Sequence, residues 1–516
     1  MVSNIRLSGL ATGMDTESLV RDMMKIARMP LDKKLKTKQT LQWKQEDYRT
    51  MNLSLLALKN KAFDMRLESS FTARKITSGN QDIVTATATG EAINGTFNLK
   101  VAQLAEAASN KTAGAVSANA GNKIDTSASL LSQASKFAEA GSFFEGKTVD
   151  DTFTVSVRIS DTEVKDFTFS YGNSLKTIIQ TINNDKKAGV TLFYDEGAAQ
   201  DKVVAASKAT GKDAVLELNG DFFSVLGLNN ANKQDGKNAV FELNGLQTER
   251  ASNNFTINGV NFSLKGVTAG GFGGAATALT VETDVDTIYN NIKGFVDQYN
   301  EIIDLLNKEL KEEKFRTYQP LTDEEKAALS ESEIEKWEAK ARSGLLRSDA
   351  LLSRAASEIR MTMAQTVKGL SGVNSLPAIG ITTANYWEDP NGKLKINEDD
   401  LKKAIAADPE GVMKLFNNDS EVANEQGLMR RLYSTVDSAI KNITSEAGSA
   451  TALYDQSNLS ESVRRIDKDI ARLEDRLTQI EERYWRQFTA MERAISTMNQ
   501  QSSWLTAQLS GLTGQQ

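Results

Sequence analysis

The feature that most constrains this chain is a stripe of apolar residues near its C-terminal end. The stripe steps by four and three residues and consists of Leu459, Val463, Ile466, Ile470, Leu473, Leu477, Ile480 and Tyr484. The next residue of the stripe, Phe488, follows Tyr484 after four residues instead of three, and this extra step is a stutter that locally unwinds a coiled coil. The stripe resumes at Met491, Ile495 and Met498. This spacing predicts one long helix with an apolar seam.

A single helix cannot bury its own apolar stripe, so the seam needs a partner. Burying one Leu or Ile contributes about 1.5–3 kcal/mol, whereas an i,i+4 ion pair such as Glu461–Arg465 contributes only about 0.2–0.5 kcal/mol. The seam, more than its charged flanks, therefore decides whether the helix is stable. A contact between subunits could supply the partner. The intramolecular alternative is an N-terminal stripe that consists of Leu19, Met23 and Ile26.

The C-terminal end differs from the rest of the seam because it carries no charge. Residues 494–516 contain no Asp, Glu, Lys or Arg. The large apolar side chains of this segment include Trp504, Leu505, Leu509 and Leu512. An uncharged amphipathic end suits an assembled state better than a free solvated tail, so we expect this segment to bind a partner.

The hydrophobic pattern changes twice along the chain, which gives the order helix, β, helix. Helical spacing dominates before residue 72 and after residue 284, whereas period-two alternation dominates between them. Within the β region, Asn258-Gly259 lies between alternating apolar residues and predicts a two-residue type I′ hairpin. Residues 175–182 have the spacing of one helix. In the first helical region, we expect Pro30 to interrupt the helix and begin a second one. The second helix has a heptad seam that consists of Tyr48, Met51, Leu55, Leu58, Ala62 and Met65.

These patterns predict an α+β multidomain fold: a helical coiled-coil stalk formed by both chain ends, with two nested, mainly β head domains inserted between them. Residues 109–128 are rich in Ala, Asn, Ser, Thr and Gly, and we expect them to form a linker that returns near 229–238. The expected segments are an N-terminal coil (1–42), a leg helix (43–72), an outer head domain in two parts (73–108 and 238–283), an inserted distal head domain (109–237), the second part of the helical leg (284–458) and a C-terminal coil (459–516).

The composition removes most catalytic chemistry, because the chain has neither cysteine nor histidine. Without cysteine there are no disulfides, thiolate metal sites or cysteine nucleophiles. Without histidine, a Ser-His-Asp triad cannot form. The glycine run 270–274 lacks the Lys-Ser/Thr that completes a phosphate-binding P-loop. We therefore expect no enzyme, no cofactor and no metal site.

The charge balance excludes two further classes of protein. There are 61 basic and 68 acidic residues, a net charge of −7, with no basic block of the kind that binds nucleic acid. No apolar run is long enough for a transmembrane helix. The first 20 residues lack the apolar core of a Sec signal peptide. We expect neither nucleic-acid binding nor membrane insertion.

Several motifs lie in a fixed order along the chain. The first is residues 8–17, Ser-Gly-Leu-Ala-Thr-Gly-Met-Asp-Thr-Glu. Residues 93–105 and 239–268 follow, and then come residues 343–349, residues 379–381 and the C-terminal coil. In this order the motifs resemble the flagellar filament cap family, also called flagellar hook-associated protein 2 or FliD. The resemblance covers essentially the whole chain, with least detail in residues 109–237.

The resemblance implies a structural protein of the bacterial flagellum. Such a protein forms a homo-oligomeric ring that caps the filament tip, promotes folding and polymerisation of exported flagellin, and is required for filament elongation. Its implied partners are itself, flagellin and the distal end of the filament, the hook-filament junction proteins, and a cytoplasmic export chaperone at the C-terminus. It is extracellular and leaves the cell through the flagellar type III system without a cleaved signal peptide.

Under this interpretation, two groups of residues form the functional surface. The oligomer or filament interface along the coiled-coil seam would contain Leu19, Met23, Ile26, Leu473, Leu477 and Ile480. The C-terminal assembly or chaperone segment would contain Trp504, Leu505, Leu509 and Leu512. Two alternatives stay open at this point: another flagellar structural protein, such as a junction protein or flagellin, and an extracellular adhesin, for which cell adhesion would be the function.

Overall fold

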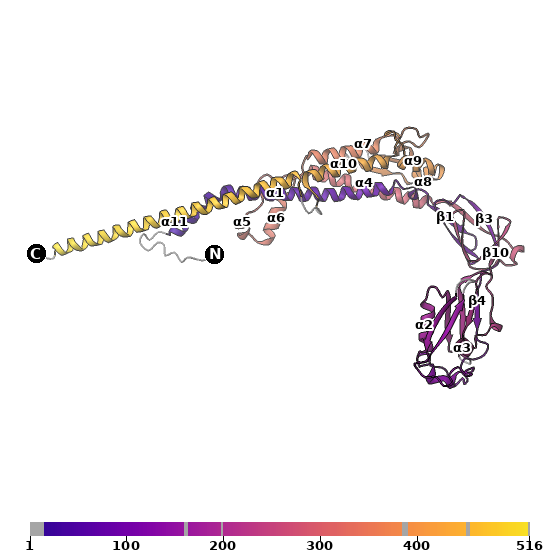
Figure 1. The fold of residues 1–516 in the computed structure, drawn as a ribbon. Helices are drawn as coiled ribbons and strands as arrows, with labels where there is room; N and C mark the ends of the chain where they lie inside the picture. The colour runs from indigo at the N-terminus through magenta and orange to yellow at the C-terminus, as the bar shows by residue number, and fades with distance from the viewer. Residues whose placement is uncertain (1–14, 159–163, 198–199, 384–390, 450–454, 514–516) are drawn as a thin grey trace. The chain divides into compact units, whose positions relative to one another are not determined.

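The computed structural model describes residues 15–158, 164–197, 200–383, 391–449 and 455–513. The chain divides into two compact units (Figure 1). One unit contains the chain up to Phe71 and from Asp286 onward, and the other contains Thr72–Val285. The first unit brings both chain ends together and the second is built from β-sheets, which confirms the expected α+β class.

The unit of the chain ends is almost entirely helical. Its α-helices are α1 (Thr16–Asp64), α4 (Val285–Lys311), α5 (Asp323–Ala327), α6 (Glu331–Arg342), α7 (Ala350–Ala364), α8 (Glu398–Ala407), α9 (Pro409–Asn417), α10 (Leu428–Ala447) and α11 (Asn458–Thr513). Strands β15 (Ile381–Thr383) and β16 (Leu394–Ile396) form a small antiparallel pair. Helix α1 packs against both α10 and α11 (Figure 1), so the two ends of the chain do form the predicted stalk.

Helix α1 runs without a break through Pro30. Its first turn is capped by Asp15, whose carboxylate accepts a hydrogen bond from the Ser18 backbone N–H at 2.9 Å. The expected interruption at Pro30 is therefore wrong. A proline removes one backbone hydrogen bond from a helix, but α1 contacts α11 before and after this position, through Met24 and Leu31. These contacts keep both flanking segments in one helix.

The second half of α1 supplies part of the core of the helical unit. The expected apolar positions are all at most 3% exposed: Tyr48, Met51, Leu55, Leu58, Ala62 and Met65. Helix α10 covers this part of α1 and packs in turn against α7 and α9. Helix α4 contributes its own buried stripe, which includes Ile292, Phe295 and Tyr299. The leg is thus a helical bundle, and the coil formed by α1 and α11 extends from it.

The first part of the β unit is a two-sheet sandwich. A five-stranded antiparallel sheet has the order β1 (Arg74–Ser78), β14 (Thr277–Thr283), β3 (Gly95–Gln103), β10 (Ala239–Leu243) and β11 (Leu246–Arg250). A three-stranded sheet has the order β12 (Asn254–Ile257), β13 (Val260–Leu264) and β2 (Val84–Ala88). Asn258 and Gly259 join β12 to β13 with φ angles of 49° and 75°. The predicted type I′ hairpin is confirmed.

The second part of the β unit has a separate core. Its sheets have the orders β4 (Ala107–Lys111), β8 (Lys202–Thr210), β7 (Val190–Asp195) and β6 (Val164–Ser170), β5 (Thr152–Arg158), β9 (Glu217–Asn219). The expected helix is α2 (Leu175–Asn184), and a short helix α3 spans Asp221–Val225. Residues 109–128 do not form a linker, because β4 pairs with β8 and both Val116 and Ile124 are buried in this core.

Candidate assembly surface on the terminal helices

The first part of α11 is paired with α1. Ile470 and Leu477 are each only 8% exposed and form a cluster with Leu31 of α1. Half-buried side chains surround this cluster, namely Met24, Ala27, Ile466 and Leu473. Leu459, at the start of the seam, is also buried. The seam thus has an intramolecular partner from Leu459 to Leu477.

The face of α1 that provides this partner is not the expected one. Leu19, Met23 and Ile26 are 41%, 39% and 72% exposed. The expected intramolecular pairing of this stripe with α11 is therefore wrong. Helix α11 packs instead against the neighbouring stripe of Met24, Ala27 and Leu31. In a helix, positions one residue apart point in directions about 100° apart. The stripe of Leu19, Met23 and Ile26 consequently forms an apolar surface on the outside of the coil.

The second part of α11 has a different environment although its sequence pattern continues. After Leu477, no described residue of α11 is buried. Tyr484, Phe488 and Met491 are half-buried, and the helix continues alone toward its C-terminal end (Figure 1). Met498, Trp504 and Leu505 are 65%, 64% and 54% exposed. The side chains of Leu509 and Leu512 lie outside the described residues.

Ion pairs flank the paired part of the coil. The Lys34 ammonium contacts the Asp469 carboxylate at 2.8 Å, and that of Lys38 contacts Asp467 at 2.7 Å. Arg472 also contacts Asp469, at 2.7 Å, and Lys34 and Arg472 together lower the pKa of the Asp469 carboxyl group. Exposed pairs of this kind contribute at most about 1 kcal/mol each. The ion pairs therefore help to select this register of α1 against α11 but add little to the stability of the coil.

The base of the coil contains a polar cluster that the periodicity did not reveal. Asp455, directly before α11, accepts hydrogen bonds from Arg49 at 2.7 Å, Gln45 at 3.1 Å and Ser460 at 2.6 Å. Burial raises the pKa of the Asp455 carboxyl group, but the hydrogen bonds from Ser460 and Ser457 and the Arg49 charge outweigh it, so that the pKa lies below its usual value. The cluster fixes the point where α11 leaves the bundle.

Gly448 allows this cluster to form. It follows the last turn of α10 with φ +73°, and a Cβ atom there would lie 2.2 Å from an oxygen of Asp455. A side chain at position 448 would displace the carboxylate. The sequence signal for the cluster is therefore a glycine at the end of one helix and an aspartate shortly before the next.

A groove runs between α1 and α11 beside the paired region. It has a volume of about 700 Å³, and its apolar lining includes Val20, Met24, Leu477 and Trp485. Charged side chains from both helices line its sides, and Glu324 of α5 also contributes. The groove therefore lies next to the cluster of Leu31, Ile470 and Leu477.

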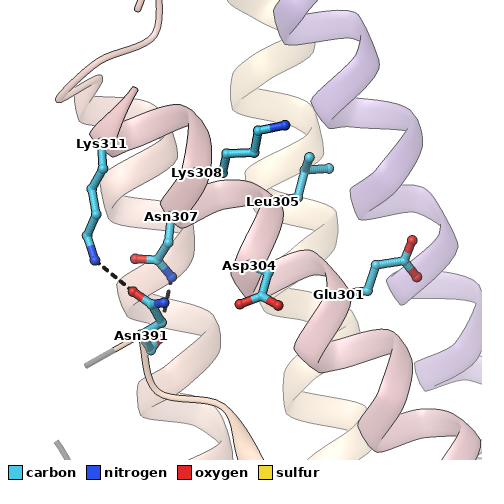
Figure 2. Close-up of a pocket in the computed structure, with 7 residues that line it drawn as sticks. All are labelled: Glu301, Asp304, Leu305, Asn307, Lys308, Lys311 and Asn391. Atoms are coloured by element: carbon cyan, nitrogen blue, oxygen red, sulfur yellow. Dashed lines mark hydrogen bonds between the residues drawn. The ribbon is translucent and has the colours of Figure 1, made fainter. Parts of the chain in front are cut away.

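A second hollow lies on α4 and shows no arrangement suited to catalysis. It has a volume of about 500 Å³. Figure 2 shows Lys311 and Asn307 directed at Asn391, with Lys311 donating to the Asn391 side chain at 2.7 Å. Asp304 on the same helix contacts Lys393 at 2.5 Å. The charged groups of Lys311 and Asp304 thus have partners in the protein itself.

The described part of the chain contains neither a candidate metal cluster nor a candidate membrane span. In the ranges given above, no three Asp or Glu side chains cluster in a way that could hold a metal ion. Among the helices of the same ranges, none is both long and apolar enough to cross a membrane. The most distinctive surface is therefore the exposed continuation of the coiled-coil seam.

Two protein-family models match the chain. "Flagellar hook-associated protein 2 N-terminus" matches residues 12–108, and "Flagellar hook-associated protein 2 C-terminus" matches residues 236–500. The second model alone covers more than half of the 516 residues. The stretch between the two matches, residues 109–235, corresponds closely to the separate core of the β unit.

Two relatives and a solved structure agree with these models. Flagellar hook-associated protein 2 of Halalkalibacterium halodurans is 31% identical over 90% of this chain and 92% of its own length. The B-type flagellar hook-associated protein 2 of Pseudomonas aeruginosa is 26% identical over 70% of each chain. The D1-D2-D3 domains of the Escherichia coli flagellar cap protein FliD share the fold with a TM-score of 0.53, at 20% identity over 81% of this chain and 99% of that one.

The order of the motifs, the helical unit made from both chain ends and the inserted β-sheets thus agree with these matches. The matches to the two family models and to the relatives exclude the hook-filament junction proteins and flagellin as the family of this chain. The chain belongs to the flagellar hook-associated protein 2 family, the non-enzymatic structural cap proteins also called FliD.

Proposed function

We propose that this protein caps the distal end of the flagellar filament as a ring of identical subunits and promotes folding and polymerisation of exported flagellin. The observation that supports this most directly is the change along α11 from a buried seam to an exposed one. A helix that keeps its apolar period without an intramolecular partner is suited to pairing in an assembly.

Two exposed apolar surfaces would form the contacts of the cap. One is the outer stripe of α1 with Leu19, Met23 and Ile26, and the other is the C-terminal part of α11 with Trp504 and Leu505. Leu473, Leu477 and Ile480 lie between them on the seam and are half-buried or buried. In this proposal they hold the coil together, while the exposed residues contact neighbouring subunits, flagellin and the filament end.

The route to the filament tip follows from the same proposal. The protein would leave the cell through the flagellar type III channel without a cleaved signal peptide and act outside the cell at the tip, next to filament and junction proteins. An export chaperone would bind Trp504, Leu505, Leu509 and Leu512 before export. An apolar segment without any charge after Arg493 is suited to such a sequestering partner.

The decisive experiment removes residues 494–516 and complements a strain that lacks its cap protein. No described residue of this segment is buried, so the truncated protein should keep the helical and β units folded but should fail to restore filaments. A double variant, Trp504→Asp with Leu505→Asp, should have the same effect. Gln500→Asp with Gln501→Asp is the matched control, since it adds the same charge at exposed positions of the same helix. Full-length filaments with the truncated protein would refute the assembly role of this segment.

A second experiment tests the coil itself. Substituting Leu473, Leu477 and Ile480 by Asp should separate α11 from α1, whereas Leu19→Asp with Ile26→Asp should leave the isolated subunit intact and weaken only the assembly. Electron microscopy and mass measurement of purified complexes would report both effects. Unchanged rings and unchanged motility with both variants would contradict the interface.

We also propose the boundaries 109–237 for the inserted head domain. The chain enters and leaves this region at adjacent positions, because Glu106 and Lys237 exchange backbone hydrogen bonds of 2.8 and 3.0 Å. The two β cores consist of different residues. Replacing residues 109–235 by a short Gly-Ser linker should therefore leave the sandwich folded, as measured by circular dichroism and proteolysis. Loss of the sandwich fold would place the boundary elsewhere.

A further inference from the structure

Residues 312–345 form a lobe that projects from the helical bundle between α4 and α7. The lobe contains α5 and α6, and its two ends are joined at a narrow neck. At this neck, the Gly344 N–H donates to Glu312 at 2.6 Å and the Ser343 hydroxyl donates to the Glu313 carbonyl at 2.6 Å. Gly344 has φ +71°, and a Cβ atom there would lie 2.9 Å from the Glu313 carbonyl oxygen. The neck is thus a close crossing of two chain segments.

The lobe has internal contacts of its own. Tyr318 and Trp337 have ring centroids 4.7 Å apart, and the Trp337 indole donates to the Gln319 carbonyl at 2.8 Å. Lys326 of α5 contacts Glu338 of α6 at 2.7 Å. Both helices begin with a capping box, which satisfies their first backbone N–H groups. These contacts hold α5 and α6 together independently of α1.

The attachment of the lobe to α1 is ionic. At the tip, Glu324 contacts Arg28 at 2.6 Å and Glu325 contacts Lys36 at 2.8 Å. Near the neck, Arg342 contacts Asp47 at 2.6 Å and Glu46 at 3.1 Å. Neither α5 nor α6 has a buried residue. No apolar core of these helices therefore adds to the ionic contacts, and the buried apolar side chain on this side is Pro320, in the segment before α5.

A crevice under the lobe shows that the two surfaces are not closely packed. It has a volume of about 660 Å³ and lies between α1, at Met29, Thr40 and Leu41, and the lobe, at Gln319 and Pro320. Close-packed interfaces leave few voids larger than a water molecule. Ion pairs therefore bridge the rim of a hollow, where solvent and salt can reach them.

The segment of α1 under the tip is strongly basic. Between positions 25 and 38 its charged residues are Lys25, Arg28, Lys33, Lys34, Lys36 and Lys38, with Asp32 as the acidic one. Acidic side chains approach this segment from two elements: Glu324 and Glu325 from the lobe, and Asp467 and Asp469 from α11. Glu324 also lines the groove between α1 and α11. The tip of the lobe thus forms part of a wall of that groove.

We propose that the lobe is an ionic clasp, which closes over the basic segment of α1 through Glu324 and Glu325 and swings open about the neck at residues 343–344 when these pairs are broken. The Arg28–Glu324 pair breaks first, because its side chains are 48% and 69% exposed, whereas those of Lys36 and Glu325 are 22% and 45% exposed and Asp47 near the neck is 19% exposed. Opening removes one wall of the groove between α1 and α11. The clasp thereby controls access to the groove between α1 and α11.

Salt provides the direct test, because screening acts on exposed charges. The Debye length falls from about 10 Å at 0.1 M salt to about 3 Å at 1 M. An exposed pair favours the closed form by about 1.5- to 5-fold, so the loss of both tip pairs should increase the ratio of open to closed lobes by about 2- to 25-fold.

The absence of cysteine makes a clean distance measurement feasible. Spin labels at Glu331→Cys, on the tip side of α6, and at Thr50→Cys on α1 would report the position of the lobe by pulsed electron resonance. A second pair, Thr50→Cys with Ser434→Cys on α10, is the control, because both positions are exposed and α10 packs on α1. We expect a single short distance for the lobe pair at 50 mM salt and a second, longer distance at 1 M salt. The control pair should not change.

Charge variants distinguish opening of the clasp from a general loosening of the helical bundle. Glu324→Gln with Glu325→Gln should produce the longer distance already at 50 mM salt, and Glu335→Gln, an exposed position elsewhere on α6, should not. Exchanging the charges of one tip pair, Arg28→Glu with Glu324→Arg, should keep the short distance at 50 mM salt, and it leaves Glu325 in the capping box of α5. An unchanged lobe pair in both 1 M salt and the Gln variant would overturn the proposal. So would two distances already at 50 mM salt, or parallel changes in the control pair.

Discussion

The two parts of α11 have the same apolar period but opposite environments. From Leu459 to Leu477 the seam is paired with α1 and includes positions with 8% exposure or less. From Ile480 onward the spacing continues through the stutter at Phe488, yet Trp504 and Leu505 are more than half exposed. Periodicity therefore identifies which face of a helix needs a partner, but it does not say whether the partner lies in the same chain.

The first prediction substitutes one leucine in each part. Leu477→Asp should destabilise the paired coil by about 2–4 kcal/mol, because it removes a buried leucine and places a carboxylate in the cluster with Leu31 and Ile470. Leu505→Asp should leave the stability of the isolated subunit unchanged, since the side chain is 54% exposed. Hydrogen exchange of α11 in the monomer measures the difference. Equal effects of the two substitutions would show that the two parts of α11 do not differ in their contacts within the subunit.

The second prediction concerns the point where the paired part begins. Gly448→Ala should cost about 1–3 kcal/mol, because the backbone there has φ +73° and the new methyl group would displace Asp455. The loss should appear as faster hydrogen exchange in the first turns of α11, with little change after Leu477. Gly372→Ala is a useful control: φ there is +88°, but open space surrounds the position. If both variants behave alike, the contact with Asp455 has no special role.

The fold was largely predictable from the sequence, but the partner faces were not. The heptad spacing of Tyr48–Met65 and the turn at Asn258-Gly259 report local requirements, and both are confirmed. The stripe of Leu19, Met23 and Ile26 has the same local signal as Met24, Ala27 and Leu31, and only the course of α11 decides between them. The expected interruption at Pro30 and the expected linker at residues 109–128 fail for the same reason, because tertiary contacts outweigh local preference there.

The candidate site was predictable to a similar extent. The uncharged C-terminal segment is visible in composition alone, because charges stop at Arg493. The distant partners of Asp455 were not predictable, since the cluster joins Gln45 and Arg49 of α1 to a residue about 400 positions later. Neither periodicity nor composition encodes a polar contact of that separation.

The third prediction uses the low pKa of Asp455. A carboxyl group whose pKa is lower in the folded protein stabilises the fold above its unfolded pKa of about 3.9, and this stabilisation is lost as the pH falls through the folded value. Asp455→Asn should therefore cost about 1–2 kcal/mol at pH 7, because Arg49 loses a charged partner, and progressively less below pH 4. Thermal unfolding of both proteins from pH 7 to pH 2.5 measures this. A difference that stays constant down to pH 2.5 would contradict the role of the charge.

The smallest effect is expected from the ion pairs beside the paired seam. Lys38→Gln or Asp467→Asn should change stability by less than about 1 kcal/mol, since both side chains of this pair are substantially exposed. The charges should instead influence which register of α1 against α11 forms, because a shift by one heptad preserves the apolar stripe but separates Lys34 from Asp469 and Lys38 from Asp467. Reversing both lysines, Lys34→Glu with Lys38→Glu, should therefore lower the population of this register at low salt and have little effect at 1 M salt. Reversing Asp467 and Asp469 to Lys in the same chain should restore it. Cross-linking of Met24→Cys to Leu477→Cys would report the register, and a yield that is unaffected by charge would show that apolar packing alone selects the register of α1 against α11.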